Sequence, residues 1–445
     1  MNIKKHLNFS SLRLFLSSIF RGFPDHRQKG KVKHSVHDAT MAAFACMHFQ
    51  DKSFLQFEKR VDEALHPENL KNLFDIQTIP EATQIRSVLD GIESNEFSPI
   101  FKEVFSRLQR GKHLEQYQVL PGLYYAAMDA TEYFSSKKIS CPKCLKCEHK
   151  NGEVTCSHKV LQAAIMHPNM PQVVPLMPEA IHNTDGELKQ DCEMNAAKRL
   201  IPKLRQQHPK LGFIIGGDAL FSKQPIIEDV LNNGMHYLFV AKPDDHEYMM
   251  AYIDVIRQIQ GVHSILLPQK DGKIHKYEWS NDVPLNGRND GIRVNYFSLT
   301  IMTIQKDGSE KITYRSSWVT DIMVDKANVE LLSKAGRCRW KIENECFNTL
   351  KNQGYAAEHN YGHGENHLAF NIYLLTLIAF TFHQVFELTD RLYQACRKKL
   401  GSKTHLWETL RAYAKILVFK TWEMLLDFTL DPMKYGVTMS QLRSP

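Results

Sequence analysis

The sequence lacks a strong net charge, a secretory signal and a long uninterrupted hydrophobic run. Its 445 residues carry a net charge of only +7, which permits a polyanionic partner without demonstrating one. The apolar stretch at residues 12–20 is broken by Arg13 and by serines, so it does not fit a signal peptide. The most apolar later run, residues 368–386, contains Asn371 and His383, and a buried helix explains it better than a membrane span. We therefore expect a cytoplasmic protein without a membrane segment.

Internal repeats and low-complexity segments are also absent, which leaves an ordinary globular chain of two or three structural units. Basic residues are concentrated at its start. Residues 1–34 contain one acid, Asp25, and eight basic residues: Lys4, Lys5, Arg13, Arg21, Arg27, Lys29, Lys31 and Lys33. This segment is either a solvated, partly disordered arm or an arm that contacts phosphates, and the sequence favours neither.

The hydrophobic pattern divides the rest of the chain into helical and sheet-forming parts. Helical spacing marks residues 37–49, 53–61, 83–92 and 98–108. Strands are expected at 123–128, 160–166, 172–177, 213–215 and 237–240, with helices at 191–208 and 225–232. Short alternating runs follow at 276–279, 294–303 and 312–319, and helices return from 329 to about 428.

This order of elements predicts an α/β fold in which a mixed sheet core contains a β-rich insertion and is preceded and followed by helical regions. The predicted parts are 1–118 for the basic arm and helical region, 119–246 for the first part of the core, 247–320 for the insertion, 321–385 for the core helices and 386–445 for the C-terminal helices. The small helical region after the basic arm is either a DNA-binding module or a scaffold.

Two aspartates, Asp129 and Asp218, each follow a short apolar strand and stand beside small residues. An ionised carboxylate in that setting is costly to bury and needs a cation or a hydrogen-bond donor. Two such residues on neighbouring strands can hold a pair of divalent ions about 4 Å apart, the arrangement used for phosphoryl transfer. The alternative is that each aspartate caps a turn, and for either residue alone that is the better interpretation.

A third carboxylate favours the metal-site interpretation over two separate turn caps. Residues 337–351 form a predicted helix without helix breakers, and Glu343 lies on its apolar face, one turn after Arg339. Glu345 lies among the more polar positions of the same helix. A carboxylate on the packed face needs a reason to be there, so Glu343 is the better candidate.

Taken together, three segments resemble the conserved blocks of bacterial insertion-sequence DDE transposases, in the group that has a Tyr-Arg-Glu-Lys signature helix. They are MDATEYFS at 128–135, GGDALF at 216–221 and RWKIE at 339–343. The similarity extends from about residue 21 to 385 and includes TQIR at 83–86 and NQGYAAEH at 352–359. The helix block is the most specific of these, and either aspartate block alone would be weak.

The resemblance implies a ribonuclease-H-like core and a DNA transposase that cleaves transposon ends and joins them to target DNA. It implies that Asp129, Asp218 and Glu343 are catalytic and bind two Mg²⁺ ions, for which Mn²⁺ is a plausible substitute. Residues 35–118 would read the transposon ends, and the C-terminal helices would contribute to a synaptic homodimer. A nucleoid-associated protein in the cytoplasm is the corresponding location.

The basic residues around the three carboxylates depart from the family pattern. The expected tyrosine is Gly336, and the expected lysine is Leu350, with Lys351 one place later. Arg339, Lys351 and Lys242 are the candidates for contacts to DNA phosphates. Two alternatives stay open: a ribonuclease-H-like nuclease or inactive transposon relic, and a DNA-binding protein without enzymatic activity.

The nine cysteines are odd in number, and four of them crowd into residues 141–158 together with two histidines. Reduced thiols in a cytosolic chain are the simplest interpretation. Cys141, Cys144, Cys147 and Cys156, with His149 and His158 nearby, offer enough soft ligands for a structural zinc. Four free thiols in a hairpin are the alternative. A further histidine, His359, and the loop at 360–364 suit either a turn or a DNA contact.

Overall fold

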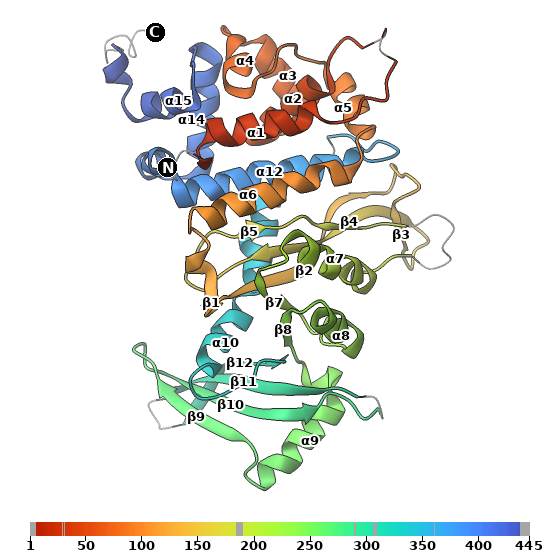
Figure 1. The fold of residues 1–445 in the computed structure, drawn as a ribbon, viewed down its shortest axis with the longest axis vertical. Coiled ribbons are helices and arrows are strands. Elements are labelled where there is room, and N and C mark those ends of the chain that lie inside the picture. The colour runs from red at the N-terminus through yellow and green to blue at the C-terminus, as the bar shows by residue number, and fades with distance from the viewer. Residues whose placement is uncertain are drawn as a thin grey trace.

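Three blocks follow one another along the long axis of the molecule: helices at one end, a mixed sheet in the middle and a β-rich block at the other end (Figure 1). This computed structural model describes residues 6–28, 30, 32–183, 190–288, 291–305, 309–359 and 361–436. Within these ranges the chain forms a mixed α/β fold with one twelve-stranded sheet of parallel and antiparallel strands. The predicted α/β class with flanking helices is therefore confirmed.

The helical end begins with α1 (Phe9–Arg21), α2 (Val36–His48), α3 (Phe54–Asp62), α4 (Glu68–Phe74), α5 (Ala82–Asp90), η3 (Ser94–Phe97), α6 (Ser98–Arg110) and η4 (Glu115–Tyr117). Asn8, Ser35 and Ser53 start three of these helices, because each side chain accepts a hydrogen bond from a backbone N–H in the first turn. Every residue of α2 is buried, which makes it the central helix of this block.

The expectation of an N-terminal arm is wrong for residues 9–21. Helix α1 buries Phe9, Leu12, Leu16 and Phe20 against the rest of the block. Its last basic residue, Arg21, forms an ion pair with Asp75 at 2.8 Å. The sequence pattern failed here because Ser17, which interrupts the apolar run, is itself buried and hydrogen-bonded to His37 and Asp75, so a polar residue inside the run does not mark an exposed segment. Lys4, Lys5, Lys29 and Lys31 lie outside the described residues.

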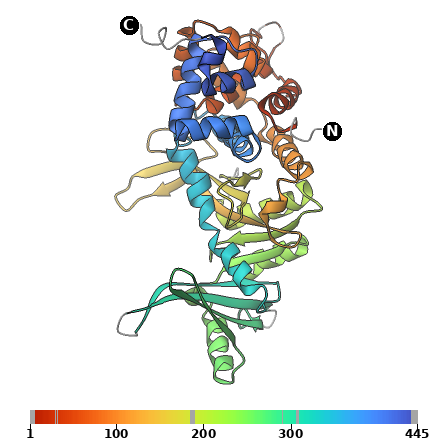
Figure 2. The ribbon, with the colours of Figure 1, turned by 90° about the vertical axis from the view of Figure 1, so that its left-hand side faces the viewer.

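The chain returns to this block in its last part, through α12 (Leu368–Thr389), α13 (Arg391–Leu400), α14 (Lys403–Ile416), α15 (Trp422–Leu430) and η7 (Pro432–Tyr435). Trp422 stacks on Phe9 with ring centroids 4.6 Å apart, so the two terminal segments share one core. We call α1–α6 and α12–α15 the helical unit; its red, orange and blue segments lie side by side in both views (Figures 1 and 2).

Among the described residues, α12 is the one helix long and apolar enough to cross a membrane, but 89% of its most apolar window is buried inside the structure. It packs against α2 and α5 on one side and β5 on another, which accounts for its hydrophobicity as that of a core helix. This agrees with the prediction of a buried helix over residues 368–386.

The strands are β1 (Gln118–Leu120), β2 (Leu123–Ser136), β3 (Leu145–Glu148), β4 (Val154–Ile165), β5 (Val174–Pro175), β6 (Glu179–Ile181), β7 (Gly212–Gly217), β8 (His236–Val240), β9 (His263–Pro268), β10 (Lys273–Pro284), β11 (Arg293–Ile304) and β12 (Glu310–Thr320). Their main order is β3-β4-β2-β7-β8-β12-β11-β10-β9. Strands β2 and β4 are antiparallel, whereas β2, β7 and β8 are parallel. The parallel strands are connected through α7 (Glu193–Gln207) and α8 (Gln224–Asn232).

The β-rich block continues the core sheet, because β12 pairs with β8 through Trp318, Val319 and Thr320. After η5 (Pro243–Asp245), this block begins with a helix that the sequence did not predict, α9 (Glu247–Gln258). Few of its residues are buried, so its hydrophobic stripe is short.

The segment after β12 does not form the single regular helix predicted for residues 337–351. It consists of α10 (Val329–Arg337), a π-helical stretch η6 (Ile342–Phe347) and α11 (Asn348–Asn352). A π-helical turn changes which side chains share a face, so the regular helical periodicity assumed from the sequence does not hold there.

Candidate active site and metal centre

Asp129 and Asp218 project from neighbouring parallel strands at the same level of the sheet. The parallel pairing of β2 with β7 ends where Ala127 faces Gly216, and each aspartate stands two residues beyond that pair. Asp129 is not at the end of its strand as predicted, because β2 continues to Ser136 and Asp129 pairs with Gln162 of β4. Asp218 directly follows the last residue of β7.

The two glycines before Asp218 are required by close packing. The Tyr125 ring and hydroxyl occupy the space beside Gly216, where any Cβ atom would overlap them. Only glycine therefore fits at this position. Asp218 Oδ1 accepts a hydrogen bond from the backbone N–H of Leu220 at 3.0 Å. Asp218 therefore caps a turn, which is one of the two interpretations that the sequence left open. The second oxygen of the same carboxylate, Oδ2, can still bind another partner.

Arg339 connects two of the three predicted carboxylates. Its Nη1 lies 3.2 Å from Asp129 Oδ2, and its Nη2 lies 2.8 Å from Glu343 Oε1. The side chains of Arg339 and Asp129 are each 21% exposed, so this contact is largely shielded from solvent. The structure therefore brings residues 129, 339 and 343 together from segments far apart in the sequence.

The charge of Asp218 also acts on Asp129. Burial raises the pKa of Asp129 to about 6; Arg339 acts against this, while the charges of Glu343 and Asp218 raise the pKa further. A fourth carboxylate, Glu193 in the first turn of α7, was not singled out from the sequence. Its pKa is raised by burial and then by Asp218. The charges of Glu343 and Asp218 thus act on Asp129, and that of Asp218 acts on Glu193.

Glu343 reaches this cluster in a different way from the one predicted. Its side chain is 49% exposed and does not lie on a packed apolar face. The neighbouring Trp340 is also 46% exposed. The reason given for choosing Glu343 over Glu345 is therefore wrong, because Glu343 is exposed and Glu345 is partly buried in the same π-helical stretch. What distinguishes Glu343 in the structure is its contact with Arg339 one turn earlier.

A buried lysine fixes the segment that carries Glu343. The ammonium group of Lys341 donates hydrogen bonds to the backbone carbonyls of His167, Pro168 and Met170, at 2.9, 2.9 and 2.7 Å. These three carbonyls belong to the loop between β4 and β5. Lys341 was not identified from the sequence, because a lysine two residues before a candidate glutamate has the composition of an ordinary exposed helix.

The three candidate phosphate-binding residues have different surroundings. Arg339 is engaged with carboxylates, Lys351 forms an ion pair with Glu358 at 2.7 Å, and Lys242 is exposed just after β8. The altered family positions have packing explanations. A Cβ on Gly336 would lie 2.5 Å from the Trp318 indole nitrogen, and Leu350 is 1% exposed.

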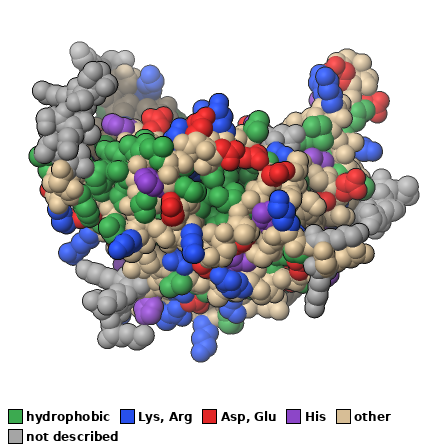
Figure 3. Space-filling view, turned by 90° about the horizontal axis from the view of Figure 1, so that it is seen from above, with side chains coloured by type: hydrophobic (Ala, Val, Ile, Leu, Met, Phe, Trp, Pro, Cys, Tyr) green, Lys and Arg blue, Asp and Glu red, His purple; other side chains and the backbone are tan. Residues whose placement is uncertain are grey.

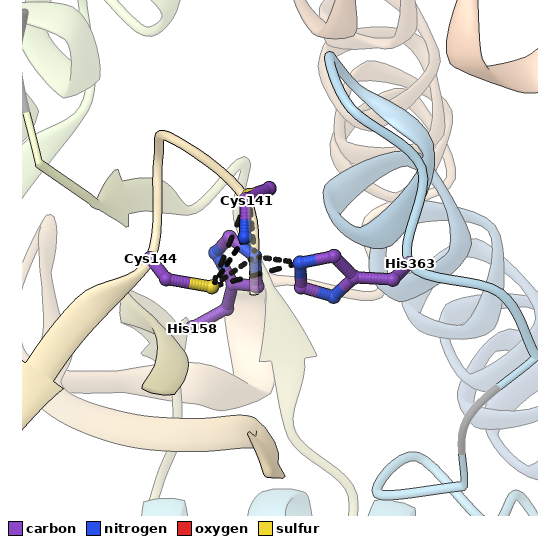
Figure 4. Close-up of side chains that lie close together, drawn as sticks. All are labelled: Cys141, Cys144, His158 and His363. Carbon is purple, nitrogen blue, oxygen red and sulfur yellow. Dashed lines mark hydrogen bonds between the residues drawn. The ribbon is translucent and has the colours of Figure 1, made fainter. Parts of the chain in front are cut away.

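A second cluster brings together Cys141, Cys144, His158 and His363 (Figure 4). Their ligand atoms all lie within 4.8 Å of one another. This corrects the predicted zinc ligands, because the antiparallel pairing of β3 with β4 places Cys147 opposite Thr155 and leaves it exposed.

Cys156 is buried on β4 but does not belong to this cluster; His158, two residues later, supplies a ligand atom instead. His363 was missed because 205 residues separate it from His158. The one feature of the sequence that could have drawn attention to His363 is its position between two glycines, Gly362 and Gly364. Asn360, at the start of the same loop, lies outside the described residues. His359 packs edge-on against Tyr361.

No protein-family model matches this chain. No curated protein matches it either. Its function therefore has to be inferred from the residues of the two clusters and their geometry.

Proposed function

We propose that this chain is a DDE transposase, which cuts DNA at the ends of a transposon and transfers the ends to target DNA in a metal-dependent reaction. The observation that carries the proposal is the convergence of Asp129, Asp218 and Glu343 from two parallel strands and a later helix. Carboxylates that share a partly buried region repel one another, which costs free energy unless cations compensate their charge.

The topology of the core supports the same proposal. Strands β6, β4 and β2 are antiparallel neighbours, and β7 and β8 continue the sheet parallel to β2. Helices α7 and α8 make the connections to the parallel strands, and the β-rich block lies between β8 and η6. We infer a ribonuclease-H-like core with an insertion before the glutamate, as in the transposase group that the sequence resembles.

The acidic cluster fits Mg²⁺ as the cofactor. All of its candidate ligands are carboxylate oxygens, which hard divalent cations prefer, and Mn²⁺ accepts the same ligands. Burial leaves Asp129 with a pKa of about 6, so a cation would favour its ionised form. When bound, two such ions supply electrostatic stabilisation of an in-line phosphoryl transfer and make the attacking oxygen a better nucleophile.

The protein side chains have distinct roles in this proposal. Asp129, Asp218 and Glu343 hold the cations at the edge where β7 ends. The Arg339 guanidinium compensates two of these carboxylates. With cations compensating them instead, it would be available to a DNA phosphate. Lys341 is a positioning residue, since its three backbone contacts hold η6 against the β4–β5 loop.

The DNA partner requires basic surfaces beyond the acidic cluster. Lys242 is exposed after β8, the strand next to β7, and is the best-placed candidate to extend a phosphate track. On the end of the helical unit seen in Figure 3, the described Lys and Arg side chains are spread among acidic and hydrophobic ones. That face therefore offers no argument for DNA binding. A synaptic homodimer remains our expectation.

The experiment is a strand-transfer assay with the native element ends and Mg²⁺. Asp129→Asn, Asp218→Asn and Glu343→Gln should each lower cleavage and strand transfer by about a hundredfold or more, because each removes a ligand charge from the reacting centre. Glu345→Gln is the matched control and should retain activity. Retention of strand transfer in all three test variants would refute the mechanism.

The same assay separates the alternatives. A wild-type protein that cleaves the ends but never joins them to target DNA is a nuclease on the same core. A protein that binds DNA equally well with and without the three carboxylates, and does not cut it, is a DNA-binding protein without enzymatic activity.

A further inference from the structure

We propose that Cys141, Cys144, His158 and His363 form a structural zinc site that fastens the sheet to the helical unit. The site is separate from the acidic cluster, and it does not depend on the proposed transposase activity. Its four ligand atoms come from a turn before β3, from β4 and from the loop that precedes α12 (Figure 4).

Five of the six distances between the ligand atoms match those of a tetrahedron around zinc. Zn–S bonds of about 2.3 Å and Zn–N bonds of about 2.0–2.1 Å imply edges of about 3.8 Å for S···S, 3.5–3.6 Å for S···N and 3.3–3.4 Å for N···N. The Cys141 and Cys144 sulfurs are 3.8 Å apart. His158 Nε2 lies 3.5 Å from each sulfur.

The fourth ligand, His363, matches two of the three distances expected for it. His363 Nε2 lies 3.5 Å from the Cys144 sulfur and 3.4 Å from His158 Nε2. The remaining edge, from Cys141 to His363, is no longer than 4.8 Å. Both histidines direct the same ring nitrogen, Nε2, toward one point, and two facing ring nitrogens at this distance are what a shared metal ion requires.

The ligand types identify the ion and its role. Two thiolates and two imidazoles in a tetrahedral arrangement are typical of Zn²⁺, whereas Mg²⁺ and Ca²⁺ prefer oxygen ligands. Four protein ligands fill a tetrahedral coordination shell and leave no position for a substrate. The site is therefore structural rather than catalytic.

The His363 loop belongs to the helical unit through other contacts. Asp90, at the end of α5, accepts hydrogen bonds from the backbone N–H groups of four consecutive residues, Glu365, Asn366, His367 and Leu368. The cysteine turn contacts the same loop through Lys143, whose ammonium donates to the Asn366 carbonyl at 2.9 Å. A zinc ion here would hold the sheet and the helical unit in one fixed orientation.

The test is the zinc content of the purified full-length protein and its variants. We expect about one zinc per chain in the wild type, as four ligands bind one ion. Cys144→Ser and His363→Ala should lose most of it. Cys147→Ser and Cys156→Ser are the matched controls, and they should keep it. Absence of zinc from protein produced with zinc in the medium overturns the proposal. So does zinc loss in the two controls with retention in His363→Ala.

A second measurement covers the case in which a ligand variant fails to fold. Wild-type protein with its zinc exchanged for Co²⁺ should show the intense visible absorption of a tetrahedral cobalt–thiolate site. A weak octahedral spectrum would contradict the proposed ligand set. In His363→Ala, which changes only the ligand from the helical unit, protease cleavage between β3 and α12 should become faster than in Cys147→Ser.

Discussion

Asp38 is a buried carboxylate whose hydrogen bonds hold the start of α2. It is 4% exposed, and its oxygens accept from the backbone N–H groups of Gln77 and Thr78 and from the Thr78 hydroxyl. Burial acts to raise the pKa of Asp38, but the hydrogen bonds from His37, Gln77 and Thr78 outweigh it and lower the pKa to about 2.

This depressed pKa predicts a specific loss of stability in acid. The stabilisation by Asp38 is present above its unfolded pKa of 3.8 and is lost as the pH falls toward about 2. At about 1.4 kcal/mol per pKa unit, the full contribution is about 2 kcal/mol, of which about 1 kcal/mol is lost between pH 5 and pH 3. Asp38→Asn should lack this part of the pH dependence.

Urea unfolding at pH 5 and pH 3 measures the effect. The wild type should lose about 1 kcal/mol more than Asp38→Asn over this interval. Asp62→Asn, which changes an exposed carboxylate in α3, serves as the control and should behave like the wild type. Identical pH dependence in the wild type and Asp38→Asn would show that this carboxylate is not stabilised in the folded state.

Gly336 is a position where the sequence departs from the signature that it resembles, and the structure gives a packing reason for the glycine. The indole of Trp318 occupies the space beside this glycine, so a tyrosine side chain has no room there. The neighbouring residues Cys338 and Ile342 are buried, and the helical backbone still carries Arg339 to the carboxylates. A change in packing thus explains the altered position.

The short π-helical stretch η6 directly follows a buried lysine, Lys341. Lys341 is 7% exposed and satisfies three backbone carbonyls of the β4–β5 loop. Lys341→Met keeps the length of the side chain but leaves these carbonyls without a donor. We expect a loss of about 2–4 kcal/mol in the free energy of unfolding, as buried acceptors are costly to leave unpaired.

The control for this prediction is Lys334→Met in α10. Lys334 is 51% exposed and forms only an ion pair with Glu330, so its loss should cost no more than about 1 kcal/mol. Urea unfolding compares the two variants. If strand transfer is detected, it should fall in Lys341→Met, because Glu343 is no longer held in place. Equal stability of the two variants would contradict the positioning role.

The sequence predicted some elements well because their hydrophobic patterns are local. Buried or strongly amphipathic segments such as α2, α7 and β7 were found within a few residues of their observed bounds. The strand predicted over residues 172–177 shrinks to Val174–Pro175, because prolines cannot donate to a strand ladder. The π-helical stretch had no signal, since its sequence suits an α-helix equally well.

Across the complete chain, the two ends depend on each other for folding. Asn69 of α4 donates hydrogen bonds to the carbonyls of Ala414 and Leu417, at 2.7 and 2.6 Å, and accepts one from the Phe419 N–H at 2.8 Å. It is 5% exposed. This single side chain therefore satisfies three backbone groups that lie more than 300 residues away in the sequence.

Asn69→Ala should destabilise the protein by about 2–4 kcal/mol, because it leaves three buried groups unpaired. Asn72→Ala, from the same helix, removes one bond to the Phe419 carbonyl at 3.2 Å and should cost about 0.5–1.5 kcal/mol. The measurement is the urea midpoint of the full chain. A smaller effect for Asn69→Ala than for Asn72→Ala would mean that the terminal segments fold independently.

The sequence alone was enough to select the three acidic candidates and the cysteines Cys141 and Cys144, because the residues next to each of them in the chain point to it. Asp129 and Asp218 follow apolar strands, and Glu343 stands one helical turn from Arg339. The contacts of Arg339 with Asp129 and Glu343, and the replacement of Cys147 and Cys156 by His158 and His363, could not be inferred. Strand and helix patterns report the contacts of nearby residues, whereas a four-ligand site is formed by packing segments that are more than 200 residues apart.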